Sequence, residues 1–219
     1  INMPTELRAG YNLACDFWRE VFAFHERVVK RLEDMDDRNI SAIIHRVIFG
    51  YHLRFFKAMM MSSKLPYVIA AAKKAMEDGF SPVIAMWSTG GSGLAEAMQQ
   101  SKDMDILNPE EEWFESEVSS IISAPRQSLM KFLDHYDGEK SERMMQSNFV
   151  QMSDIEDNGY EDHKRELAAL RDKLKELTLP GNPLDVLIHS LGGPEAVAEM
   201  SGRTQRQEYD YEVGSFRTV

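Results

Sequence analysis

Two arginines close to the C-terminal end of the chain have the chemistry to contact a phosphate group. Arg203 and Arg206 follow Gly202, which leaves the backbone unhindered where they project. A guanidinium group donates two hydrogen bonds at once, which makes arginine well suited to a phosphate. The same residues would also suit an ordinary exposed flank of a hairpin, and the sequence leaves both interpretations open.

A glycine-rich segment offers a second place for an anion. Residues 88–93 read Ser-Thr-Gly-Gly-Ser-Gly and follow the short apolar run 82–87. Their backbone N–H groups, together with the N-terminus of a following helix, could hold an anion. They do not form a Walker A loop, because no Gly-Lys-Ser/Thr follows. A plain connection between a strand and a helix is the alternative interpretation.

For the other residues that could do chemistry, a structural role is the favoured interpretation. His45 and His52 lie seven residues apart on one face of an expected helix, but the sequence specifies no third metal ligand. The acidic run 110–112 opens a helix, where carboxylates complement the helix dipole, and adjacent acids point in different directions. No Gly-x-Ser-x-Gly elbow is present, so a hydrolase is disfavoured and no catalytic residue is assigned.

The chain is acidic overall. It has 219 residues, of which 43% are hydrophobic, and this suits one or at most two domains with a hydrophobic core. Its formal net charge of -11 means that any nucleic-acid contact must be local. Besides the two arginines, Lys64, Lys73 and Lys74 give local positive charge, for which a solvated helix face is the plain interpretation.

The sequence also indicates a compartment. The single cysteine, Cys15, excludes an internal disulfide and a cysteine-built zinc site, and it fits a reducing cytoplasm. No apolar run reaches the roughly 18 residues of a membrane span, and the first residues lack the pattern of a secretory signal. The chain starts with Ile1 instead of an initiator methionine, which suggests a piece of a longer protein.

Apolar residues spaced three and four apart predict helices for most of the chain. Helices are expected over residues 5–35, 40–62, 67–78, 109–136 and 160–177, with Pro66 opening the third and a break at Ala124-Pro125. After Pro180 and Gly181, Asn182 caps a helix that Pro183 opens and Gly192 ends, and Pro194 starts another short helix. Residues 205–219 alternate as a β-hairpin with Gly214-Ser215 as its turn.

The first half of the chain has the order of a βα unit. Residues 82–87 form a short apolar run that suits a buried strand, with a helix and a glycine before it and a glycine-rich loop after it. Ligands of parallel sheets bind beyond the C-terminal ends of the strands, which is where residues 88–93 are expected. The sequence therefore predicts an α/β fold that is predominantly helical.

Two blocks of sequence resemble the strawberry notch family, specifically its helicase C-like domain. Residues 179–203 read LPGNPLDVLIHSLGGPEAVAEMSGR, and residues 52–57, 64–66 and 82–90 read HLRFFK, KLP and PVIAMWSTG. The resemblance covers roughly residues 18–206. It implies a partial RecA-like second lobe of the P-loop NTPase type, with a helical N-terminal segment (1–63), the start of the lobe (64–108), a helical insertion (109–178) and the continuation of the lobe (179–219).

The resemblance implies a parent protein of helicase superfamily 2, from a phage, a mobile element or a eukaryote, that translocates on nucleic acid by using ATP and Mg²⁺. Ser88, Thr89 and Gly90 match a loop beside the nucleic-acid path, and Arg203 and Arg206 become candidate phosphate contacts. DNA is favoured over RNA. Gly91 departs from the family, which often has glutamate there, so no role of that acid is carried over.

The chain lacks the parts of an ATPase that the resemblance places in an N-terminal lobe of the same protein. It has neither a Walker A motif nor an Asp-Glu-x-His box, so it is expected to be inactive alone and to hold no cofactor.

A helical protein-interaction module is the alternative function, supported by the large helical share and the acidic composition. The family is associated with transcriptional regulation in eukaryotes and with methyltransferase-linked anti-restriction proteins in phages. The expected compartment is therefore the cytoplasm for a bacterial or phage-encoded protein and the nucleus for a eukaryotic one, with no membrane partner.

Overall fold

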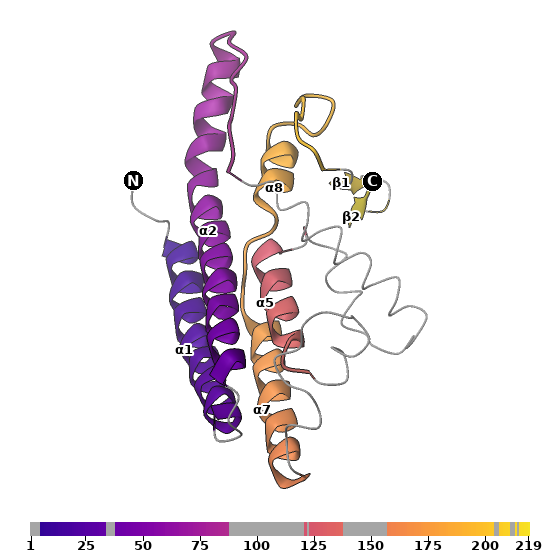
Figure 1. Cartoon of the computed structure of the whole chain (residues 1–219). Coiled ribbons are helices and arrows are strands. Elements are labelled where there is room, and N and C mark those ends of the chain that lie inside the picture. The colour runs from indigo at the N-terminus through magenta and orange to yellow at the C-terminus, as the bar shows by residue number, and fades with distance from the viewer. Residues whose placement is uncertain are drawn as a thin grey trace. The chain divides into compact units, whose positions relative to one another are not determined.

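The computed structural model describes residues 5–33, 38–87, 121, 123–137, 157–203, 206–210, 213 and 215–219 (Figure 1). The chain divides into two compact units: unit 1 contains Ile1–Lys57 and Ser128–Thr178, and unit 2 contains Ala58–Gln127 and Leu179–Val219. The described part is predominantly helical, as the sequence predicts, and its strands form one two-stranded sheet. None of the described helices has the length and apolar character needed to cross a membrane.

Unit 1 is built from helices whose apolar residues repeat every three or four positions. Helix α1 spans Thr5–Glu33, and helix α7 spans Asp157–Glu176. The first part of α2, Arg38–Glu77, and most of α5, Ala124–Asp134, belong to the same unit. The predicted helices over residues 5–35 and 160–177 are confirmed, and so is a helix that starts at Ala124.

Trp18 lies in the aromatic core of unit 1. Its ring centroid, in a side chain that is almost fully buried, lies 5.7 Å from that of Phe55 and 6.0 Å from that of Phe132. Tilted and edge-on contacts of this kind are the arrangements that aromatic rings prefer. The core is completed by other buried apolar side chains, among them Ala14, Phe17, Val21, Phe24, Val28, Ile48, Leu129, Leu133, Leu167, Leu170 and Leu174.

Helix α2 differs from its prediction at Pro66. The sequence predicts one helix that ends at Ser62 and another that Pro66 opens, but Arg38–Glu77 form a single helix with Pro66 inside it. An interior proline lacks the N–H of a helical hydrogen bond and costs a helix about 3 kcal/mol. Met59 and Leu65 before the proline and Ala72 after it are buried, and this burial offsets the cost.

Unit 2 contains a small apolar cluster. Leu65 and Ala72 of α2 meet Leu187 of α8, which spans Pro183–Ser190, and Leu191, which follows it. Partly buried side chains from the neighbouring segments pack against this cluster, namely Val68, Ile69, Ile84, Met86, Val186 and Val197. The cluster holds α8 in a fixed place within the unit.

The predicted buried strand over residues 82–87 is not observed. The segment has no regular secondary structure, and Val83 and Trp87 are each 89% exposed, whereas Ile84 and Met86 pack against the cluster of unit 2. A strand needs a neighbour for its backbone N–H and C=O groups. The two strands among the described residues pair with each other, so neither serves this segment.

The predicted β-hairpin is confirmed at the C-terminal end. Strands β1, Gln207–Asp210, and β2, Ser215–Thr218, run antiparallel, with Gln207 opposite Thr218. Ser215 belongs to β2 and not to the turn. The rings of Tyr209 and Phe216 lie 5.5 and 5.0 Å from that of His189 on α8, so the helix packs on one face of the hairpin. An isolated two-stranded hairpin needs such a contact, because it is marginally stable on its own.

The second short helix predicted at Pro194 does not form. Residues 194–196 make a turn, residues 197–200 have no regular structure, and Met200 is 93% exposed. Gly192 and Gly193 adopt φ values of 107° and 82°, a left-handed conformation that ends α8 at the glycine that the sequence predicts. The buried side of this helix was expected to consist of Ala196, Val197 and Met200, of which only Val197 packs against the cluster of unit 2. So short a helix is unstable without more packing.

Candidate functional site

The candidate site lies at the start of α8, and a helix cap positions it. The Oδ1 atom of Asn182 accepts hydrogen bonds from the backbone N–H groups of Leu184 at 2.9 Å and Asp185 at 3.4 Å. Pro183 occupies the first turn of the helix, as the sequence predicts. This cap is typical of a helix N-terminus, and it fixes Asp185 in the first turn.

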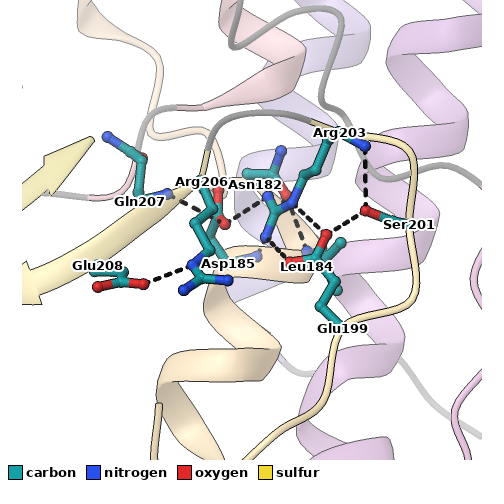
Figure 2. A network of polar contacts seen from close by, with 9 residues as sticks. All are labelled: Asn182, Leu184, Asp185, Glu199, Ser201, Arg203, Arg206, Gln207 and Glu208. Atoms are coloured by element: carbon teal, nitrogen blue, oxygen red, sulfur yellow. Dashed lines mark hydrogen bonds and ion pairs between the residues drawn. The ribbon is translucent and has the colours of Figure 1, made fainter. Parts of the chain in front are cut away.

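The carboxylate of Asp185 joins three segments of unit 2. Its side chain is fully buried, and its Oδ1 atom accepts hydrogen bonds from Nη1 of Arg203 at 2.6 Å and from the backbone N–H of Gln207 at 3.4 Å (Figure 2). The other oxygen, Oδ2, has no hydrogen-bond partner among the described residues. Asp185 therefore ties α8 to the loop before the hairpin and to the first residue of β1.

Arg203 lies between two carboxylates, and its side chain is only 4% exposed. Besides its contact with Asp185, its Nε and Nη2 atoms donate to the two oxygens of Glu199 at 2.6 and 2.8 Å (Figure 2). The Ser201 hydroxyl also contacts Glu199 and accepts a hydrogen bond from the Arg203 backbone N–H at 3.4 Å. The forked guanidinium that suits a phosphate is thus directed at carboxylates inside the protein.

Burial and neighbouring charges shift the pKa values of Asp185 and Arg203 in opposite directions. Burial raises the pKa of Asp185, because loss of water disfavours the carboxylate, although the charge of Arg203 opposes this effect. Hydrogen bonds from Arg203 lower the pKa of Glu199. Burial by itself would lower the pKa of Arg203, but hydrogen bonds to Glu199 and Asp185 outweigh it and the pKa is raised. Arg203 therefore stays charged.

Arg206 lies at the edge of the network and is more accessible. Its side chain is 40% exposed, and its Nε atom donates to Oε1 of Glu208 at 2.5 Å. Its backbone N–H and C=O groups pair with those of Val219 at 3.0 and 2.9 Å, which closes the open end of the hairpin. Unlike Arg203, Arg206 can turn toward a phosphate without leaving a fully buried carboxylate unpaired.

The other three predicted contact residues lie outside the described part of the chain. They are Ser88, Thr89 and Gly90, which follow directly after the described residue Trp87. The acidic run 110–112 also lies outside the described residues. Their roles stay predictions. Of the five predicted contact residues, the structure therefore describes the two arginines and joins Arg203 to Asp185 and Glu199.

The two histidines considered as metal ligands contact different partners. The Nδ1 atom of His45 lies 3.0 Å from Nε2 of His25, whereas the ring of His52 lies 4.9 Å from that of Trp18. Among the residues that the structure describes, no three His, Cys, Asp or Glu side chains are grouped to hold a metal ion. The arrangement around Arg203 can position a loop and present Arg206.

Asp185 and Glu199 are functional candidates that were not predicted from the sequence. Asp185 interrupts the apolar pattern of a short helix, and a charged residue at such a position signals a buried ion pair. Glu199 precedes Arg203 by four residues, the spacing of paired side chains on a helix, although the segment is not helical.

The chain is similar to two longer proteins. It is 26% identical to the protein strawberry notch homolog 1 of Rattus norvegicus over an alignment of 254 residues, which covers 90% of the chain and 20% of that protein. It is 27% identical to the protein FORGETTER 1 of Arabidopsis thaliana over 128 residues, which cover 58% of the chain and 9% of that protein. The chain therefore spans a fifth or less of the length of these relatives.

No protein-family model matches the chain, and no solved structure matches it. The distant similarity to strawberry notch homolog 1 extends over most of the chain, and it suggests the family that residues 52–90 and 179–203 resemble.

Proposed function

We propose that the chain is part of a helicase-related protein of superfamily 2 that moves on nucleic acid, and that it contributes to the C-terminal lobe of the motor. The observation that carries this proposal is the distant similarity to strawberry notch homolog 1, which extends over 90% of the chain. The two motif blocks that resemble the strawberry notch family occur in the expected order along the chain.

The conformation of residues 82–87 supports a RecA-like lobe. Ile84 and Met86 pack against the cluster of unit 2, while Val83 and Trp87 are exposed, which is the alternation of a strand. No backbone hydrogen bond joins residues 82–86 to another described residue. We propose that this segment becomes a strand when a neighbouring backbone of the parent protein lies beside it.

In this proposal, ATP and Mg²⁺ bind in the parent protein, where an N-terminal ATPase lobe supplies the phosphate-binding loop that this sequence lacks. The chain alone is expected to have no ATPase activity. A cytoplasmic or nuclear location stays a prediction that depends on the source of the protein.

Nucleic-acid contacts are assigned to Ser88, Thr89, Gly90 and Arg206. The half-exposed side chain of Arg206 supports this role. Arg203 is buried between Asp185 and Glu199, so its proposed role is to hold the start of the hairpin from which Arg206 projects.

The proposal is tested by DNA binding of the full chain, with single-stranded and double-stranded DNA and with RNA at rising salt concentrations. Arg206→Ala should weaken binding and reduce the slope of log affinity against log salt by about 1, because one phosphate contact is lost. Arg217→Ala is a matched control, because Arg217 lies on the same hairpin, is 63% exposed and also pairs with an acid.

A chain that is folded by circular dichroism but binds no nucleic acid at low salt would contradict the assigned contacts. Equal losses for Arg206→Ala and Arg217→Ala would also contradict them, because such losses indicate a general effect of charge.

A further inference from the structure

Trp87 combines a large apolar ring with almost complete exposure to solvent. Its side chain is 89% exposed, and it directly precedes the glycine-rich segment 88–93. A tryptophan ring is among the side chains that gain most free energy on leaving water. The exposed fraction shows that the apolar cluster of unit 2 leaves this ring in solvent, so a ligand can cover it.

The residues before Trp87 hold it in this orientation. The segment that follows α2 runs back beside the helix (Figure 1), and its Ile84 and Met86 pack against the cluster of unit 2. Val83 and Trp87 alternate with them and are exposed. Because successive side chains of an extended segment point to opposite sides, the packing of Met86 turns Trp87 outward.

A neighbouring strand would not cover this ring. Strands join a segment along its edges through backbone hydrogen bonds, whereas side chains stand above and below the sheet. If residues 82–87 pair with a backbone of the parent protein, as proposed above, that strand leaves the ring of Trp87 uncovered. The pairing also places Trp87 at the C-terminal end of a strand, where ligands of parallel sheets bind.

The flat ring of Trp87 fits a nucleobase. The ring carries no charge for a phosphate, but bases stack on aromatic side chains in proteins that bind single strands. The next residue along the chain, Ser88, is a proposed contact to nucleic acid, and adjacent Cα atoms are about 3.8 Å apart. A nucleotide whose phosphate lies at Ser88 can therefore bring its base to Trp87.

We propose that Trp87 stacks on an unpaired base and thereby makes single-stranded DNA or RNA the preferred ligand of this chain. A base inside a duplex has both faces covered by its neighbours, so Trp87 adds nothing to the binding of a double strand. This inference rests on the proposed function and deepens it, because it names the form of the nucleic acid and a contact that carries no charge.

The experiment measures binding of the full chain to a single strand, in DNA and RNA versions of one sequence, and to the DNA duplex. Trp87→Ala should bind both single strands about tenfold more weakly, the loss expected for one stacked base. Its affinity for the duplex should not change. The slope of log affinity against log salt should also stay the same, whereas Arg206→Ala reduces it.

An oligonucleotide with abasic sites separates stacking from phosphate contacts, because it keeps the phosphates and lacks the bases. The wild type should bind this strand about as weakly as Trp87→Ala binds the complete one. Trp87→Ala should then cause no further loss on the abasic strand, which is how a double-mutant cycle identifies two groups in contact. Tryptophan fluorescence should fall when the wild type binds the complete strand, and this change should be smaller in Trp87→Ala.

Two further variants are controls. Trp87→Phe keeps an aromatic face and should retain most of the affinity. Phe80→Ala removes a ring that is 69% exposed, seven residues earlier in the same connection, and should leave the affinity unchanged. Circular dichroism verifies that each variant is folded, as expected for changes of exposed side chains.

Three results would overturn this inference. If the wild type binds single strands and Trp87→Ala binds them equally well, the stacking contact is wrong while the proposed function stands. If the wild type binds no nucleic acid, the proposed function fails and this inference fails with it. If Trp87→Ala dissociates a dimer of the chain and keeps its affinity for nucleic acid, the ring binds a second copy instead of a base.

Discussion

Arg203 has the side chain that phosphate recognition requires, but here it binds two carboxylates of its own chain. Arg203→Ala would leave Asp185 and Glu199 without their cation, so we expect it to lower the free energy of unfolding by about 3–5 kcal/mol. Asp185→Asn should cost less, because the amide keeps an oxygen acceptor and carries no charge to bury. Urea unfolding at neutral pH measures both changes.

The exposed Arg217 provides the reference for this measurement, since Arg217→Ala should change the free energy of unfolding by at most about 0.5 kcal/mol. A similarly small change for Arg203→Ala would mean that the buried network does not stabilise the fold.

His25 makes the stability of unit 1 depend on pH. Its buried ring lies between the Tyr136 hydroxyl, 2.7 Å from Nδ1, and the Nδ1 atom of His45, 3.0 Å from Nε2. Burial, together with the charge of His45, lowers the pKa of His25 to about 4 from 6.5. The unfolded chain therefore binds more protons between these two pH values, so the free energy of unfolding should fall as the pH drops through this range.

The loss of stability from His25 should approach about 3 kcal/mol near pH 4 and should be absent above the pKa of the unfolded chain. His25→Gln keeps a donor and an acceptor but cannot titrate, so its free energy of unfolding should depend less on pH. Urea unfolding at several pH values between 4 and 7 compares the variant with the wild type. Parallel pH profiles for the two proteins would exclude His25 as the source of the effect.

Among the elements, α2 contains an unfavourable residue that can be removed. Pro66 is exposed inside this helix and cannot donate a backbone hydrogen bond. Pro66→Ala should therefore raise the free energy of unfolding, by up to about 3 kcal/mol, whereas Ala70→Gly in the same helix should lower it by about 1 kcal/mol. Thermal unfolding followed by circular dichroism measures both, and a destabilising Pro66→Ala would mean that the proline shapes the helix for packing.

For some elements, residues close in the chain are enough to predict where a helix starts and ends. Asn182, Pro183 and Gly192 mark the start and end of α8 through hydrogen bonds and backbone angles within a few residues, so the sequence locates this helix correctly. The segment that begins at Pro194 carries similar start signals but buries too little apolar surface to become a helix.

Across the whole molecule, the two units combine segments that are far apart in sequence. Unit 1 unites Ile1–Lys57 with Ser128–Thr178, and unit 2 unites Ala58–Gln127 with Leu179–Val219. A single helix, α2, contributes to both units and contrasts in charge with the acidic chain. The candidate network around Arg203 lies within unit 2.

The sequence by itself determined the features that depend on short-range physics. The periodicity of α1 and α7, the cap of α8 and the alternation of the hairpin each involve hydrogen bonds or packing faces set by residues close in the chain. The resemblance to the strawberry notch family likewise came from local motifs, and the similarity over 90% of the chain agrees with it.

The tertiary structure decided the features that depend on partners distant in sequence. Arg203 is buried because Asp185, eighteen residues earlier, lies within 2.6 Å of it, and the spacing of the two residues does not reveal this contact. Residues 82–87 remain outside a sheet because strand formation requires a neighbouring backbone. Helix α2 continues through Pro66 because apolar residues are buried on both sides of the proline. Their burial outweighs the free-energy cost of a proline inside a helix, which is the part that the local sequence shows.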